Sequence, residues 1–399
     1  MINKELLKKI FDAFYIQRWN DQIRPVPMIE MDKHAHKMYI AYVLAKYEEQ
    51  AGRKVNWVDL ARGGVFDLLR RIILCDIKSP IYYRIKEEHP SVFQKLSRWV
   101  WTQLKPAIAD PALQKEIKEY MINEKKFMNP HARRILKAAH VYASYWEFRI
   151  IRTASPNAKE MAAIDKRFQM AFRKFEDIAG MRKLLNNEPV AEFIDIVGQL
   201  RFQVRWQQKP RIPATSVLGH CMMVAVITYL LTRQLKKPCS ARISNNFFAA
   251  LMHDLPEALT RDIISPVKGS VPGLEQVISE IEKDMVKNEI HPLLEKQWIP
   301  QFRYLTEDEF AGRSIARGKT RKTNSDDINR KYNSDKYQPV DGELVRAADH
   351  LSAFIEATAS IEAGISTPEL KQAADSIKCS YAGRTIAGLN IGTIYKNWE

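Results

Sequence analysis

The chain has few cysteines and no pair of them at metal-binding spacing. Its four cysteines, Cys75, Cys221, Cys239 and Cys379, lie far apart in 399 residues and form no CxxC motif. Because disulfide scaffolds and structural zinc knots need closely spaced cysteines, this distribution argues against both and fits a reducing compartment. We therefore expect the cysteines to be small, buried, hydrophobic side chains.

Long apolar runs are also missing. The longest, from Val217 to Leu231, is interrupted by Gly219 and His220 and is shorter than the roughly 20 residues that cross a bilayer. The first residues, MINKELLKKIFDAFYIQRW, mix charged and apolar residues at helical spacing and lack the features of a signal peptide. The sequence thus predicts an N-terminal structural helix and a cytoplasmic protein with no membrane partner.

The charge is shifted to the basic side, and one segment concentrates it. There are 62 Lys and Arg against 47 Asp and Glu, a net charge of +15, with 46% hydrophobic residues, which excludes disorder as the main state. Residues 313–331, RSIARGKTRKTNSDDINRK, hold seven basic residues and few apolar ones. We expect a flexible, solvated loop there, with guidance of a phosphate-bearing substrate as the alternative role.

The hydrophobic pattern is helical along nearly the whole chain. Apolar residues recur every three or four positions, and few stretches alternate like a half-buried strand. Prolines and glycines at NPHARR, PRIP and SPVKGSVPG divide this pattern into helices of ordinary length. The sequence predicts an all-α fold, and its length suggests two or three domains of about 100–200 residues.

Short segments of the first half recur in the same order in the second half. This order predicts two pseudo-symmetric copies, residues 1–185 and 186–399, packed like the subunits of a symmetric dimer. The matching segments are Arg18-Trp19 with Arg205-Trp206, Arg24 with Arg211, His36 with His220, DLLRRIILCDIKSP with DLPEALTRDIISP, and LKAAHVYASYWE with VRAADHLSAFIE.

The second half contains four side chains suited to a metal ion. His220, the doublet His253-Asp254 and the late Asp349 lie in separate helical segments. Imidazole nitrogens and carboxylate oxygens suit a divalent ion of intermediate hardness, and four such ligands leave positions open for water and substrate. This composition is typical of a catalytic site, whereas structural sites are closed.

The spacing of these residues resembles the HD superfamily of metal-dependent phosphohydrolases. The match extends to RW, TSVLGH, HDLPEALTRDIISPVK and GELVRAADHLSAFIEA, which resemble the YfbR-like 5′-deoxynucleotidases over most of residues 200–360. The resemblance implies an HD-domain helical bundle that releases phosphate from deoxyribonucleoside 5′-monophosphates. It also implies that His220, His253, Asp254 and Asp349 bind one divalent ion, Mn, Co, Fe, Ni or Mg, whose bound water attacks the phosphate.

The resemblance implies further catalytic and substrate-binding residues. Glu257, four residues after His253, would share its helix face and orient or deprotonate the attacking water. Arg205 matches a phosphate-holding guanidinium, and Trp206 matches a wall against the sugar that excludes a 2′-hydroxyl. Three weaker candidates for substrate contacts are Thr260, Asp262 and Lys268.

The first half has the pattern of a degenerate copy. Asp67-Leu68 stands opposite His253-Asp254, and His140 stands opposite Asp349, so the ligand set is incomplete. We expect His140 to be a hydrogen-bonded interior residue and residues 1–185 to act as a structural partner of the catalytic half. The protein would then be a monomeric pseudodimer or a homodimer that acts on a small nucleotide.

The residues leave two other functions open. One is an HD-type phosphodiesterase or triphosphohydrolase that acts on other nucleotides or on oligonucleotides, with the basic segment as a guide. The other is a nucleotide sensor or scaffold without catalysis. Departures from the family, Gly219 in place of an acidic residue and Ile264 in place of a proline, make the substrate the least constrained inference. Nucleic acid is not the favoured partner, since the chain has no zinc-finger spacing and no helix-turn-helix pattern.

Overall fold

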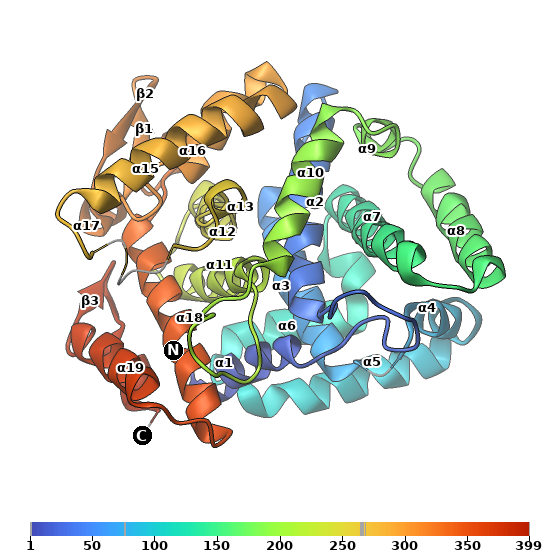
Figure 1. Ribbon diagram of the computed structural model, residues 1–399, viewed down its shortest axis with the longest axis horizontal. Helices are drawn as coiled ribbons and strands as arrows, with labels where there is room; N and C mark the ends of the chain where they lie inside the picture. The colour runs from blue at the N-terminus through green and yellow to red at the C-terminus, as the bar shows by residue number, and fades with distance from the viewer. Residues whose placement is uncertain (1, 76, 264–266, 268, 399) are drawn as a thin grey trace.

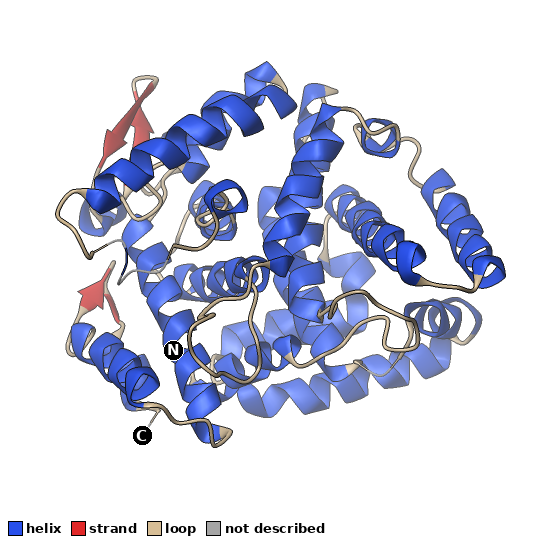
Figure 2. Cartoon of the chain, viewed as in Figure 1, coloured by secondary structure: helices blue, strands red, loops and turns tan. Residues whose placement is uncertain are grey.

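The protein folds almost entirely into helices, as predicted. The computed structural model describes residues 2–75, 77–263, 267 and 269–398. Within these residues, strands are confined to two short antiparallel hairpins (Figure 2). None of the described helices combines the length and the apolar character that a membrane crossing requires.

The α-helices α1 to α10 lie in the first 199 residues, and the predicted N-terminal helix is the first of them (Figure 1). Their bounds are α1 (Lys4–Phe11), α2 (Glu30–Gln50), α3 (Trp57–Ile73), α4 (Ser79–Glu88), α5 (Pro90–Leu104), α6 (Pro111–Phe127), α7 (Pro130–Ala154), α8 (Ala158–Arg173), α9 (Met181–Leu185) and α10 (Pro189–Gln199).

The second half contributes the remaining helices and both hairpins. Its helices are α11 (Val217–Arg233), α12 (Ser240–Leu251), α13 (Glu257–Thr260), α15 (Leu274–Met285), α16 (Ile299–Thr306), α17 (Ser325–Asp327), α18 (Gly342–Glu362), α19 (Pro368–Ser380) and α20 (Gly392–Lys396). Its strands are β1 (Arg313–Ala316), β2 (Lys319–Lys322), β3 (Thr385–Ile386) and β4 (Leu389–Asn390).

Helices α2 and α11 form the centre of the molecule. Helix α2 packs against α7 and α11, and α11 packs in turn against α12 and α18. Almost every residue of both helices is buried, and one hydrophobic core extends from Ile2 to Tyr395 through both halves. Burial on all sides explains why the sequence of α11 is apolar without a clear polar face.

The two central helices approach closely at their N-termini. Ser216 caps α11 by accepting a hydrogen bond from the Gly219 amide at 2.8 Å, and its hydroxyl donates to the Asp32 carboxylate of α2. A Cβ atom on Gly219 would lie 2.6 Å from the Phe14 ring and 2.7 Å from an Asp32 oxygen. This contact requires glycine at position 219. The carboxylate of Asp32, on α2 in the other half, takes the place of the acidic side chain that the family has at this position.

The chain enters α2 and α11 through the same local geometry. Isolated bridges pair Gln17 with Ile29 and Val204 with Ser216, and each helix begins at the residue after its bridge. Trp19 and Trp206, which lie within these entry loops, both have left-handed backbone angles, with φ of 54° and 60°. Such angles are uncommon for bulky residues and persist only where the surroundings impose them.

The pairing of His36 with His220 is wrong. His220 is the fourth residue of α11, whereas the fourth residue of α2 is Lys33 and His36 lies three positions later. His36 donates from Nε2 to the Ile194 carbonyl at 2.9 Å, and its ring contacts Trp146 edge-on. His36 is therefore a core residue. Apolar periodicity alone could not show whether this histidine lies in the core or in a site.

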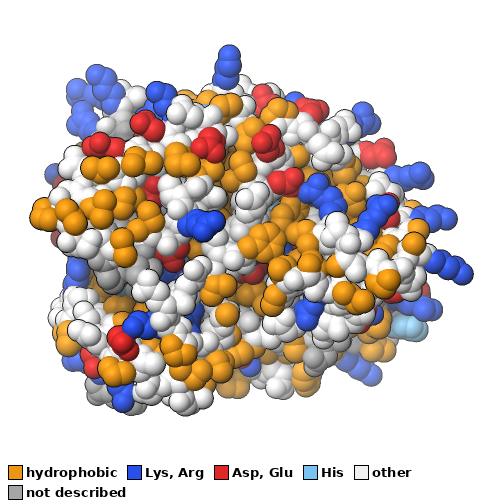
Figure 3. Space-filling model, viewed as in Figure 1, with side chains coloured by type: hydrophobic (Ala, Val, Ile, Leu, Met, Phe, Trp, Pro, Cys, Tyr) orange, Lys and Arg blue, Asp and Glu red, His pale blue; other side chains and the backbone are white. Residues whose placement is uncertain are grey.

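The basic segment 313–331 is more ordered than expected. It forms the β1–β2 hairpin, α17 and a following helical turn. Arg313 is 3% exposed, and its guanidinium donates to the carbonyls of Tyr304, Leu305, Asp308 and Ala311. The prediction of a flexible loop is therefore wrong for the hairpin. Strand β2 is nevertheless exposed, and basic side chains gather at the corner of the molecule where the hairpin lies (Figure 3).

A buried ion pair joins α12 to the start of α18. Arg242 Nε and Nη2 donate to the two Asp341 carboxylate oxygens at 2.6 and 2.8 Å, and Asn246 donates to the same carboxylate. Neither Arg242 nor Asp341 is exposed. The pair fixes the relative position of two segments whose ends carry His253 and Asp349.

We expect Arg242→Leu to lower the free energy of unfolding by about 3–5 kcal/mol, because it leaves Asp341 buried without its cation. Urea denaturation followed by circular dichroism measures this. The control is Arg303→Leu, which removes an exposed pair with Glu307 and should cost about 1 kcal/mol or less. Equal losses in the two variants would show that the buried pair has no special role.

Candidate metal centre

Four predicted ligands from distant parts of the sequence converge on one point. His220 comes from α11, His253 and Asp254 from the turn after α12, and Asp349 from α18. His220 Nε2 lies 3.0 Å from Asp349 Oδ1 and 3.7 Å from Asp254 Oδ2, and His253 Nε2 lies 3.2 Å from Asp254 Oδ2. The ligand atoms of His220, His253 and Asp349 all lie within 4.8 Å of one another.

The orientation of His220 leaves its Nε2 lone pair for a cation. On the other side of the ring, Nδ1 lies 3.2 Å from Glu356 Oε1 and 3.1 Å from Ser352 Oγ. A neutral imidazole has one N–H, and the Glu356 carboxylate holds it on Nδ1. Nε2 then faces the Asp349 carboxylate, so two hydrogen-bond acceptors lie opposite each other. A metal ion between them stabilises this arrangement.

His253 is held in the same tautomer by the backbone. Its Nδ1 lies 2.8 Å from the Ala250 carbonyl, which accepts the Nδ1 proton and leaves Nε2 towards Asp254. Burial acts to lower the pKa of His253, but the Asp254 carboxylate outweighs it and raises this pKa well above the usual value. That shift reports a negative field, which also favours a divalent cation.

Both carboxylates of the set are held in the ionised form. Burial alone would raise the pKa of Asp254, but His253, His220 and Arg205 lower it far below its usual range. The pKa of Asp349 is also lowered, because the contact with His220 outweighs burial. Carboxylate oxygens and imidazole nitrogens are the donor set that a catalytic divalent ion requires, and a bound ion would displace the extra proton that the raised pKa gives His253, so the residues present fit the expected cofactor.

Cys221 lies beside the centre but behaves as predicted for a buried thiol. Its side chain is not exposed, and it is within ligand distance of His253 and Asp254. Burial raises the pKa of the Cys221 thiol above its usual value, which keeps it protonated and makes it a poor metal ligand. Its place next to His220 in α11 accounts for its proximity.

Glu257 reaches the centre by a different route from the one predicted. Helix α12 ends at Leu251, residues 252–256 form turns, and Glu257 begins the separate helix α13, so His253 and Glu257 do not share one helix face. Pro256 lacks the amide proton that a continuous helix would need there. Both residues nevertheless line one pocket, which contains six carboxylates and a single lysine, Lys283.

Arg205 and Trp206 are anchored to the centre by Glu356. Arg205 Nε lies 3.4 Å from Glu356 Oε2, and its Nη1 lies 3.7 Å from Asp254 Oδ2. Trp206 donates from Nε1 to Glu356 Oε2 at 2.7 Å. Burial acts to lower the pKa of Arg205, but these carboxylates outweigh it, so the guanidinium stays charged beside the candidate metal ligands.

The three weaker candidates are placed less informatively. Thr260 Oγ1 lies 3.4 Å from Glu282 Oε1 and from two backbone carbonyls, so its hydroxyl faces an acidic neighbour. Asp262 is partly buried and contributes to the field that keeps Arg205 charged. Lys268 lies outside the described residues. None of these placements by itself indicates a phosphate contact.

Sequence reasoning missed Glu356, which organises the centre. It lies seven residues after Asp349 and four after Ser352 on α18, and all three contact the His220 ring. This spacing puts them on one face of a helix. An acidic residue at that spacing from the last ligand was the available signal, and the sequence does not show that it is buried.

We expect Glu356→Gln to weaken the affinity for Mn²⁺ by about 10–100-fold, because the neutral amide no longer fixes the His220 tautomer. Isothermal titration calorimetry measures the affinity, and circular dichroism checks that the variant folds. Glu362→Gln, a half-exposed residue on the same helix, is the matched control and should bind as wild type does. A folded Glu356→Gln protein with unchanged affinity would contradict the assignment.

Comparisons with known proteins point to the same part of the chain. Residues 197–378 match the family model described as HD domain. No curated protein matches the chain significantly. Among solved structures, the chain is similar to an HD-domain phosphohydrolase from Listeria innocua at 18% identity, over 52% of this chain and 86% of that one, with a TM-score of 0.39. The four converging side chains lie within the segment that matches the HD domain model.

Proposed function

We propose that this protein is a metal-dependent phosphohydrolase that releases phosphate from deoxyribonucleoside 5′-monophosphates. The observation that carries the proposal is the convergence of His220, His253, Asp254 and Asp349 within reach of one ion, beside a charged Arg205. The HD domain match over residues 197–378 supports the same reaction class. The proposed location is cytoplasmic.

The chain's own residues divide the work of this reaction. A divalent ion held by the four ligands would lower the pKa of a coordinated water and offset charge on the transferring phosphoryl group. Glu257, in the pocket next to His253 and Asp254, is placed to accept the proton of the attacking water.

Arg205 and Trp206 would define the substrate side. The Arg205 guanidinium, held between Glu356 and Asp254, can donate to the non-bridging phosphate oxygens and orient the phosphorus towards the metal. Trp206, fixed by its bond to Glu356, presents a rigid ring as a wall against the sugar. A deoxyribose fits against such a wall more closely than a ribose with its 2′-hydroxyl.

We also propose that residues 1–185 and 186–399 arose by duplication and pack as a pseudodimer. The matching entry bridges support this view, because Gln17 and Val204 are 187 residues apart and so are Ile29 and Ser216. So does a second buried glutamate, because Glu147 accepts hydrogen bonds from Arg18 and Trp19 as Glu356 does from Arg205 and Trp206.

We expect metal-dependent phosphate release that is lost in Asp254→Ala. The assay is a panel of ribo- and deoxyribonucleoside mono- and triphosphates with Mn²⁺, Co²⁺, Ni²⁺ or Mg²⁺, and chelation should abolish turnover reversibly. Asp375→Ala, an exposed residue of the same domain, is the control and should leave the rate unchanged. A wild-type rate equal to that of Asp254→Ala on every substrate would refute the enzyme.

The same panel, with a single-stranded oligonucleotide added, separates the proposal from its closest rival. A deoxynucleoside monophosphatase yields inorganic phosphate and a deoxynucleoside, whereas a triphosphohydrolase yields triphosphate and a phosphodiesterase yields shortened oligonucleotides. The exposed basic strand β2 is the feature that favours an oligonucleotide substrate. Activity on single strands that weakens steeply with salt would support that alternative.

We expect Glu257→Gln to reduce kcat by about 10²–10⁴-fold with little change in KM, because it removes a proton acceptor and keeps the shape. Steady-state kinetics on the best substrate of the panel measure both constants. Glu275→Gln, an exposed residue of α15, should retain wild-type kinetics. Nucleotide binding without turnover in both wild type and Glu257→Gln would instead indicate a sensor.

A further inference from the structure

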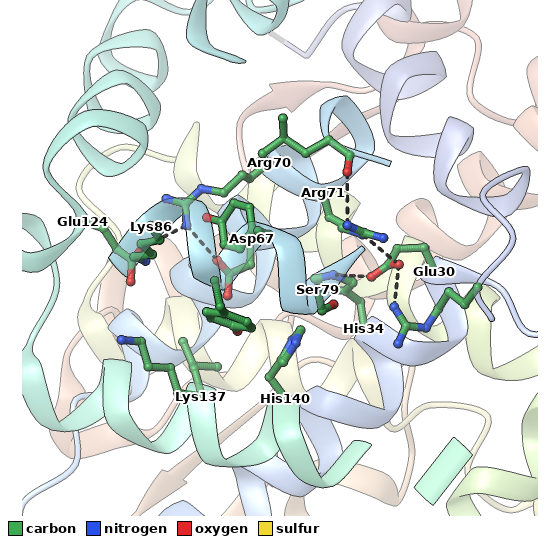
Figure 4. Close-up of a pocket in the computed structure, with 15 residues that line it drawn as sticks. Glu30, His34, Asp67, Arg70, Arg71, Ser79, Lys86, Glu124, Lys137 and His140 are labelled. Atoms are coloured by element: carbon green, nitrogen blue, oxygen red, sulfur yellow. Dashed lines mark hydrogen bonds and ion pairs between the residues drawn. The ribbon is translucent and has the colours of Figure 1, made fainter. Parts of the chain in front are cut away.

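A second pocket lies in the first half of the chain, away from the candidate metal centre. Figure 4 shows its side chains, which come from α2, α3, α4 and α7 and from the entry loop that carries Arg18. Five basic side chains, Arg18, Arg70, Arg71, Lys86 and Lys137, line it with only three carboxylates. The pocket beside the metal centre has the opposite composition, six carboxylates with one lysine. The two pockets therefore select ligands of opposite charge.

Ammonium and imidazole groups occupy the positions where the second half has its metal ligands. Lys33, the fourth residue of α2, contacts His140 Nδ1, as His220, the fourth residue of α11, contacts Asp349. Lys37 donates to Asp67 Oδ2 at 2.6 Å directly beneath the pocket. Burial lowers the pKa of Lys33 well below its usual value, so Lys33 supplies no fixed charge, and Lys37 is the buried lysine of this half that forms an ion pair, with Asp67.

The basic groups of this pocket are not fully compensated. Burial, followed by the charges of Lys33, Lys37 and Arg18, lowers the pKa of His140 well below its usual value. Burial and Lys86 likewise lower the pKa of Lys137, and no described residue forms a hydrogen bond or ion pair with its ammonium group. Burial is the larger cause of both shifts, and an anion would offset the neighbouring positive charges that add to it.

The pocket wall also contains His34, whose Nε2 faces Glu30 and whose Nδ1 is therefore an acceptor that contributes nothing to anion binding. Tyr82 and Tyr83 form the outer wall, and their rings can contact an apolar or aromatic part of a ligand.

We propose that this pocket binds a phosphate group, carried by a nucleotide or free in solution, and does not hydrolyse it. Lys86 and Lys137 at the rim would contact the phosphate oxygens, and Arg70 and Arg71 in the pocket wall would add positive charge behind them. Phosphate is favoured over a metal ion because the lining carries excess positive charge. The inference does not depend on the proposed catalytic function, since the pocket shares no lining residue with the metal centre.

The test is equilibrium binding without metal, so that catalysis plays no part. Isothermal titration calorimetry in EDTA measures binding of inorganic phosphate and, separately, of deoxyadenosine monophosphate to the full chain. We expect saturable binding at one site that Asp254→Ala leaves unchanged. Tighter binding of the nucleotide would identify it as the ligand, and equal binding would identify the free anion.

The variant Lys86→Gln/Lys137→Gln should weaken this binding at least tenfold, because charged hydrogen bonds to phosphate are lost. Both side chains are partly exposed at the rim, so the variant should fold, as circular dichroism can verify. Lys166→Gln, an exposed lysine of α8, is the matched control. Absence of phosphate binding in EDTA, or unchanged affinity in the double variant, would overturn the proposal.

Discussion

The burial of one carboxylate determines the geometry of the candidate metal centre. Glu356 is not exposed, and a buried carboxylate without partners would be too costly to keep. Burial acts to raise its pKa, but Arg205, His220 and Arg211 outweigh this and lower it far below its usual range. The same side chain holds the Trp206 indole. Helix α18, the loop before α11 and α11 itself are therefore joined through a single ionised group.

A buried glutamate with Arg and Trp partners also occurs in the first half of the chain, away from the candidate metal ligands. In the first half, Glu147 of α7 accepts from Arg18, Trp19 and Arg201 and is fully buried, as Glu356 is. At the fourth position of α2, Lys33 contacts His140, whereas at the fourth position of α11 His220 contacts Asp349. Retaining the glutamate and its cations keeps the helices in position, whatever ligand the pocket takes.

Sequence patterns were sufficient for the fold class and for the set of side chains that converge. The helical period is a local property, and the HD doublet with its flanking motifs has a distinctive spacing, so both were readable. Glu356 was missed because a carboxylate in an amphipathic helix has the same pattern whether it faces water or a buried arginine. The position of Glu257 depends on where α12 ends. The pairing of His36 with His220 failed because the two helices align three residues away from it. Only packing decides either feature. The roles of the site residues stay predictions.

The contact between Gly219 and Asp32 has a consequence for how such a protein can change. In an assembly of two identical subunits, every substitution at the symmetry axis occurs twice and meets its own copy. Here the third residue of α11 is glycine and the third residue of α2 is aspartate, and each complements the other. A single polypeptide can therefore accumulate different residues on the α2 side and the α11 side of this contact. Because the two halves are covalently joined, they are present in equal numbers at any protein concentration.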